Sequence, residues 1–139
     1  MKLLITGGAG FVGARLARTL LARATLAGRP IGQLVLADQA GAPPDLLADR
    51  RVQERVGPLL AQCAALRDED FDGVFHLASA VSGECEADFD MKLLSALNQE
   101  GTTIIQVTHD TRVADFSRRV VELADGWLTA DRGVTSPKD

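Results

Sequence analysis

The chain has 139 residues, a length that fits one domain with a core of its own. Its net charge of −4, without a cluster of Lys or Arg, argues against nucleic acid and anionic membranes as partners. No apolar run reaches the length of a membrane helix and no secretory signal is evident, so we expect a cytoplasmic protein, of undefined oligomeric state. Cys63 and Cys85 are too few for a disulfide framework and form no metal motif.

The N-terminal stretch is typical of a strand, a glycine-rich turn and the start of a helix. Residues 2–6 form a short apolar run that ends in β-branched Ile5 and Thr6. Three glycines follow at G-x-x-G-x-x-G spacing: Gly7, Gly10 and Gly13. Apolar residues then recur every four positions, as on one face of a helix: Val12, Leu16 and Leu20.

This order of elements predicts a cradle for phosphate groups. Glycines permit a tight turn and let a pyrophosphate approach the backbone closely. The unpaired N–H groups and the dipole of a helix start attract its charge. The same pattern also fits a glycine-rich turn that binds nothing, and the sequence leaves both interpretations open.

The chain then alternates strands with helices. After a helix over residues 10–25, the expected elements are strands over residues 33–37, 51–56 and 72–78, a helical turn over 45–49 and a helix that begins at Pro58. Asp38 directly follows the second strand. This alternation predicts an α/β fold with a parallel sheet and right-handed crossovers.

The C-terminal part predicts one more helix and strand, and then a hairpin. Four apolar residues give the helix a hydrophobic face: Met91, Leu93, Leu94 and Leu97. Gly101 ends this helix, and residues 102–108, rich in β-branched side chains, form a fifth strand. A short helix follows Asp110, and Asp125-Gly126 is typical of a hairpin turn.

We therefore expect a three-layer αβα Rossmann-like parallel sheet, with strands in the order 3-2-1-4-5 and a C-terminal β-hairpin at the edge. An alternative order places the fifth strand between the first and the fourth. Residues 1–130 would form a single domain, and the polar residues 131–139 a disordered tail.

Three motifs resemble one family. TGGAGFVG at residues 6–13, Asp38 after LVLA, and FHLAS at residues 75–79 are similar to the extended short-chain dehydrogenase/reductases, also called NAD-dependent epimerase/dehydratases. The run AVSGECEADFD at residues 80–90 resembles the D-erythronate dehydrogenase branch of that family. The resemblance covers roughly residues 1–90.

The resemblance implies that the chain binds the dinucleotide NAD. The residues that would hold its pyrophosphate are Gly7, Gly10, Phe11, Val12 and Gly13. Asp38 would bind the adenosine ribose hydroxyls and favour NAD over NADP. The residues that would line the cofactor past the fourth strand are Leu77, Ala78 and Ser79. Where the family commonly has Gly-Asp-Leu, with the Asp near the adenine, this chain has Gly57-Pro58-Leu59.

A second resemblance begins near residue 91. LLSALNQEGTTIIQVTHD at residues 93–110 and RVVELADGWLTA at residues 119–130 are similar to the end of an ABC-transporter ATP-binding domain, where His109 matches the switch histidine. The chain lacks the phosphate-loop motif G-x-x-x-x-G-K-[ST] of such ATPases. It also contains no tyrosine, so it lacks the Tyr-x-x-x-Lys pair of the dehydrogenases. From these absences we expect no enzyme.

The sequence thus predicts an engineered Rossmann/P-loop chimera whose fragments join near residue 90, and which binds NAD weakly without catalytic turnover. Two alternatives stay open: a purely structural chimera without a ligand, and a remnant NAD-dependent oxidoreductase.

The remaining polar candidates receive structural interpretations. We expect His76 to be a hydrogen-bonded core histidine, and His109 to be solvated or to cap a helix. Four acidic residues fit a solvated loop and helix start better than a metal site: Glu84, Glu86, Asp88 and Asp90. We therefore assign no catalytic residue and no metal ligand.

Overall fold

The computed structural model describes residues 1–78, 84–114 and 116–134, with the backbone alone for residues 84–90 and 112. The chain divides into two compact units, Met1–Val107 and Thr108–Asp139. In the described part of the chain, no helix combines the length and the apolar character needed to cross a membrane.

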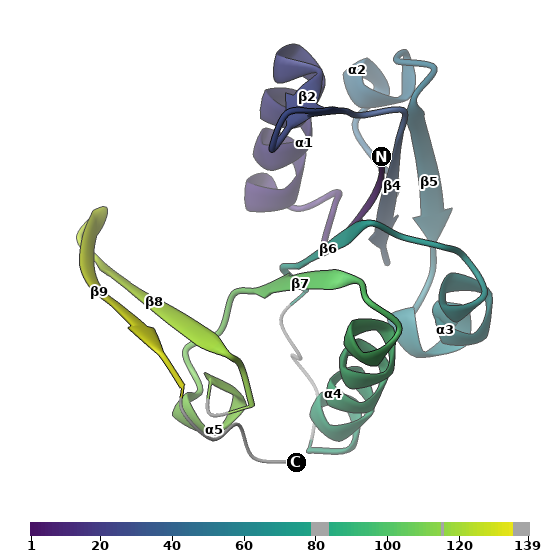
Figure 1. The fold of residues 1–139 in the computed structure, drawn as a ribbon. Helices are drawn as coiled ribbons and strands as arrows, with labels where there is room; N and C mark the ends of the chain where they lie inside the picture. Colours follow the sequence, from purple (N-terminus) through teal and green to yellow (C-terminus); the bar gives the residue numbers. More distant parts are fainter. Residues whose placement is uncertain (79–83, 115, 135–139) are drawn as a thin grey trace. The chain divides into compact units, whose positions relative to one another are not determined.

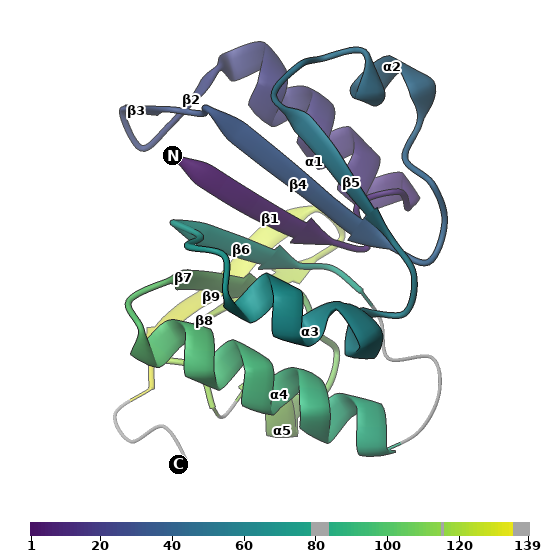
Figure 2. The same cartoon turned by 90° about the vertical axis from the view of Figure 1, so that its right-hand side faces the viewer.

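The first unit is built on a five-stranded parallel sheet (Figure 2). Its strands, in spatial order, are β5 (Val52–Val56), β4 (Gln33–Asp38), β1 (Lys2–Thr6), β6 (Gly73–His76) and β7 (Thr103–Gln106). The predicted order 3-2-1-4-5 is confirmed. The alternative order is wrong, because β1 pairs directly with β6, whereas β7 pairs with β6 alone.

Helices cover both faces of this sheet, as Figure 2 shows. One face packs against α1 (Phe11–Arg23) and α2 (Pro44–Leu47), and the other against α3 (Leu59–Arg67) and α4 (Glu84–Gln99). Alternation along β1 explains the two layers. Leu3 and Ile5 lie in the cluster with α1, whereas Leu4 lies in the cluster with α3 and α4. The predicted three-layer Rossmann-like architecture is confirmed.

Two local predictions differ from the structure. The expected apolar face of α1 included Val12, but this side chain is exposed, and the helix buries a face made by Gly13, Ala17 and Leu20. The structure also has a small hairpin between α1 and β4 that the sequence did not predict: β2 (Thr25–Leu26) and β3 (Arg29–Pro30).

The second unit contains α5 (Thr111–Ala114) and the predicted hairpin, β8 (Arg119–Ala124) and β9 (Trp127–Gly133), seen in Figure 1. Its turn has positive φ at Asp125 and Gly126, as the hairpin signal requires. β9 reaches Gly133, so the first residues of the expected disordered tail form a strand. The Arg119–Asp131 ion pair, with an N–O distance of 2.6 Å, crosses the hairpin there.

Candidate dinucleotide site

The glycine turn joins β1 to α1 at the carboxyl edge of the sheet. The Gly7 N–H donates to the Ala37 carbonyl at 2.8 Å, which fixes the turn against β4. Gly7 has a φ of 70°, a conformation that glycine adopts readily. A Cβ on Gly13 would lie 2.1 Å from the Gly7 carbonyl oxygen, so the helix start packs directly on the turn. Gly7 and Gly13 are therefore required by the backbone itself.

Gly10 differs from these two glycines. Its φ of −69° and ψ of 169° suit any residue, and an added Cβ would meet only the Gly7 carbonyl oxygen, at 3.3 Å. The fold therefore makes a weak demand for glycine at this position. A ligand that approaches the backbone closely explains the glycine better than packing does.

The start of α1 offers hydrogen-bond donors to an anion. Gly10 is the N-cap, no side chain caps the helix, and its first turn contains no acidic residue. The N–H groups of the first turn of a helix have no acceptor within that helix. The backbone at Phe11, Val12 and Gly13, together with the helix dipole, therefore fits a phosphate group. Phe11 and Val12 are exposed, which leaves this end of the helix open to a ligand.

Asp38 ends β4 beside this turn. One of its oxygens, Oδ2, accepts the Ala9 N–H at 3.0 Å, and the other, Oδ1, accepts the Ala40 N–H at 3.3 Å. A carboxylate accepts up to about four hydrogen bonds, so Asp38 keeps capacity for hydroxyl groups. Asp38 thus joins the expected ribose site to the expected pyrophosphate site. The sequence predicted its position but gave no signal for its contact with Ala9, which is a backbone donor.

The segment after β6 lies against the same turn. The Leu77 N–H donates to the Thr6 carbonyl oxygen at 3.1 Å, and a Cβ on Gly7 would lie 2.9 Å from the Ala78 nitrogen. The structure therefore brings Leu77 and Ala78 together with the glycine turn. Ser79, the third residue predicted there, lies outside the described residues.

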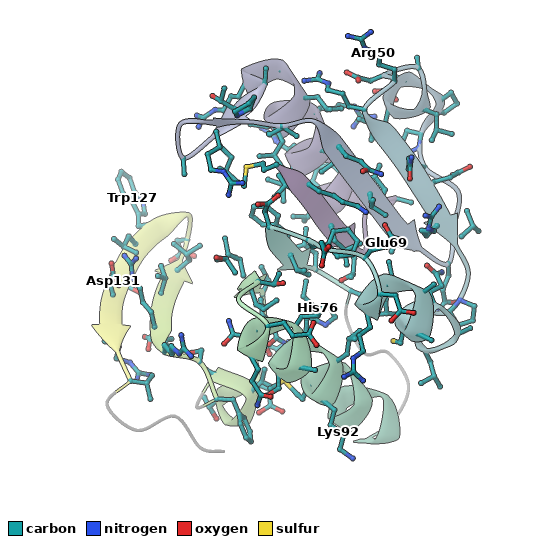
Figure 3. The ribbon with its side chains drawn as sticks, turned by 45° about the vertical axis from the view of Figure 1, so that its right-hand side comes forward. Arg50, Glu69, His76, Lys92, Trp127 and Asp131 are labelled. Atoms are coloured by element: carbon teal, nitrogen blue, oxygen red, sulfur yellow. The ribbon has the colours of Figure 1, made fainter. Side chains whose placement is uncertain are left out.

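His76 lies between the sheet and α4 (Figure 3), and the prediction of a hydrogen-bonded core histidine is confirmed. Its Nδ1 is 2.7 Å from the Thr6 hydroxyl oxygen, and burial lowers the pKa of the ring. The Thr6 hydroxyl also accepts the Ala78 N–H at 3.4 Å. Thr6 therefore links the buried histidine to the segment beside the glycine turn. The sequence carries no signal for this role of Thr6, because a threonine that ends a strand is common.

The other polar candidates belong to other elements of the chain. His109 is exposed and belongs to the second unit. The acidic residues 84–90 are described by their backbone alone, within α4. Elsewhere in the described chain, no group of three or more His, Cys, Asp or Glu side chains is arranged to hold a metal ion.

Sequence comparisons place two kinds of protein beside this chain. It is 44% identical over 123 residues to a D-erythronate dehydrogenase of Cupriavidus necator, a match that covers 81% of this chain and 37% of that protein. It is also 34% identical over 120 residues to a macrolide export ATP-binding/permease protein, MacB, of Rhodopseudomonas palustris, which covers 84% and 17% respectively. The chain spans well under half the length of these relatives. No protein-family model matches it.

Both predicted resemblances are therefore confirmed. Each match covers more than four fifths of the chain, so the two overlap rather than divide it at one point. A shorter match to a MacB of Paracoccus denitrificans is 53% identical over 45 residues, about a third of the chain.

Solved structures agree on the fold. A nucleoside-diphosphate-sugar epimerase from Agrobacterium tumefaciens matches with a TM-score of 0.58 and 28% identity, over 76% of this chain and 36% of that one. An NAD-dependent NDP-hexosamine 5,6-dehydratase, TunA, matches with a TM-score of 0.51 and 25% identity, over 96% and 45%. The first unit thus shares the Rossmann fold of these proteins.

The comparisons contradict the prediction that the chain is not an enzyme. The dehydrogenase relative and these two structural neighbours are all enzymes. The prediction relied on two missing motifs, and it weighed a missing tyrosine more heavily than the chemistry allows. Other side chains also donate and accept protons in catalysis, so the absence of tyrosine does not by itself exclude turnover.

Proposed function

We propose that the carboxyl edge of the first unit binds NAD. The observation that carries the proposal is the bridge from Asp38 to the Ala9 N–H, which sets a carboxylate beside an uncapped helix start. The carboxylate suits ribose hydroxyls, and the helix start suits a pyrophosphate. The NAD-dependent TunA, which shares the fold, supports the same ligand.

Each predicted residue that the structure describes has a role in this proposal. Gly7 forms the turn before the helix start, with its φ of 70°. The N–H groups at Phe11, Val12 and Gly13 bind the pyrophosphate, and Gly10 leaves room for its approach. Asp38 accepts hydrogen bonds from the ribose hydroxyls and repels the 2′-phosphate of NADP. Leu77 and Ala78 line the cofactor on the side of β6. Bound NAD supplies an acceptor for hydride.

Titration calorimetry with NAD and NADP tests this proposal. We expect a dissociation constant for NAD of about 1 mM, and weaker binding of NADP. Asp38→Ala removes charge-assisted hydrogen bonds worth roughly 1.5–3 kcal/mol, so NAD affinity falls about tenfold or more and the preference over NADP disappears.

A matched pair of glycine variants separates binding from folding. Gly10→Val fills the space beside the helix start, and we expect it to abolish detectable NAD binding. Gly32→Val is the control, because its added Cβ meets only Met1 O, at an ordinary contact distance of 3.9 Å. Unchanged NAD binding in Gly10→Val would contradict the proposed site.

We also propose that the chain is an engineered chimera with its junction near residue 90. Similarity to two unrelated kinds of nucleotide-dependent protein supports this origin. A natural gene that encodes both flanks of residue 90 in one reading frame would contradict it.

The enzyme relatives favour a second candidate function, an NAD-dependent oxidoreductase. The D-erythronate dehydrogenase relative directs the test to hydroxy acids. Incubation with NAD and D-erythronate, followed by the absorbance of reduced nicotinamide, should show turnover that Gly10→Val abolishes. Absence of reduced cofactor at high protein concentration would reject this candidate and leave the binding proposal intact.

A further inference from the structure

The turn after β5 is held by one glutamine. Gln62, in α3, donates from Nε2 to the Gly57 carbonyl at 2.7 Å and to the Arg55 carbonyl at 3.3 Å. Both partners are acceptors, so the amide nitrogen must face them and the orientation of the amide is fixed. Gly57 has a φ of 138° and donates its own N–H to the Asp38 carbonyl at 2.9 Å. The turn therefore lies directly beside the proposed ribose site.

The other atom of this amide has no partner. Gln62 Oε1 is buried. Among the buried side-chain oxygen and nitrogen atoms of the described residues, it is the one that makes no hydrogen bond. A buried acceptor without a donor is costly, and native proteins rarely keep one without a reason. An incoming ligand donor would satisfy this oxygen.

The strand order gives the direction in which a bound dinucleotide extends. The pyrophosphate site follows β1 and the ribose site ends β4, the next strand. A base attached to that ribose continues over the following strand, β5. Val56, the register partner of Asp38 at the end of β5, is 55% exposed and offers an apolar surface for a flat ring. The base thus comes to the turn that Gln62 holds.

We propose that Gln62 Oε1 accepts a hydrogen bond from the 6-amino group of the adenine of NAD, and so makes the site selective for 6-aminopurines. The inference rests on the proposed NAD site. It assigns a base contact where Pro58 supplies no polar side chain. Because protein atoms cover the oxygen, the turn shifts locally when the base enters.

Calorimetric titration with NAD and with nicotinamide hypoxanthine dinucleotide tests this proposal. The two ligands differ in the base, where a 6-oxo group replaces the 6-amino group. We expect the wild-type chain to bind NAD about tenfold more tightly. The 6-amino group of NAD donates to Oε1, whereas the 6-oxo group of the hypoxanthine dinucleotide is an acceptor and faces a second acceptor. On binding NAD, the side-chain amide signals of Gln62 in a nitrogen–proton NMR spectrum should also move.

Two variants distinguish recognition of the base from support of the turn. In Gln62→Met the ratio of the two dissociation constants should fall to about one, because only NAD loses affinity. A purely structural role would weaken both dinucleotides equally. Gln53→Met, at an exposed glutamine of β5, is the control and should keep the tenfold preference.

The outcomes separate this inference from the proposed function. Equal affinity of the wild-type chain for the two dinucleotides, with Asp38→Ala still impairing both, overturns the role of Gln62 alone. Absence of NAD binding overturns both proposals. If Gln62→Met fails to fold, the wild-type preference and the Gln62 amide signals still decide the question.

Discussion

The two units of the chain hold their apolar side chains in opposite ways. In residues 1–107, Leu3, Leu34 and Leu66 are fully buried, and each face of the sheet has its own apolar cluster. In the hairpin of the second unit, Leu123 is 71% and Trp127 is 77% exposed. The first unit therefore gains stability from burial. The hairpin depends on its backbone hydrogen bonds and on exposed ion pairs. Both contribute little to the free energy of unfolding.

The largest expected effect comes from truncating one leucine in each unit. Leu3→Ala leaves a cavity between β1 and α1 and should lower the free energy of unfolding by about 2–5 kcal/mol. Leu123→Ala removes an exposed side chain and should change it by less than about 0.5 kcal/mol. Urea unfolding followed by circular dichroism measures both. Equal losses would show that the hairpin side chains are buried in solution.

Two glycine turns sharpen the comparison. In Gly13→Ala the new Cβ meets the Gly7 carbonyl oxygen at 2.1 Å, so the backbone must move, and we expect a loss of about 2–3 kcal/mol. In Gly126→Ala the Cβ enters open space, and the strain comes only from the φ of 80°. Here the loss should be about 1 kcal/mol. Thermal unfolding compares the two variants, and a larger loss in Gly126→Ala would contradict the packing argument.

The sheet could be predicted because its signals are local and mutually consistent. Most of its strands are short apolar runs bounded by breakers, and one glycine pattern links the first strand to a helix. β5, with the sequence VQERV, is the weaker case. The buried face of α1 could not be read in the same way. Val12 has the right spacing, but the buried side of α1 runs through Gly13, Ala17 and Leu20, so Val12 lies to one side of it and stays exposed. Spacing gives a periodicity, whereas the packing partners decide which side of the helix is buried.

The site was predicted as positions rather than as contacts. Asp38 and the glycines were found from a motif, yet the hydrogen bond from Ala9 to Asp38 depends on the register between β1 and β4. Gln62 was not predicted, because a single glutamine on a helix forms no sequence pattern. That its oxygen lacks a partner is visible only in the folded structure. The hairpin of β2 and β3 was missed because each strand has two residues, too few for a periodicity.

The smallest predicted effect tests how well the first unit excludes water from His76. Burial lowers the pKa of this ring below its ordinary value of 6.5, so between the two values the unfolded chain binds a proton that the folded chain does not. The free energy of unfolding should therefore fall as the pH drops below 6.5, by at most about 1.4 kcal/mol per pH unit from this residue.

His76→Asn keeps a polar group near the Thr6 hydroxyl and removes the titration. Urea unfolding of both proteins between about pH 7 and pH 5 should give a steeper decline for the wild type, and since the carboxylates titrate in both, the difference in slope isolates His76. Parallel declines would show that the ring takes up its proton in the folded chain as readily as in the unfolded one. Water would then reach His76 in solution, although the ring is buried in the structure.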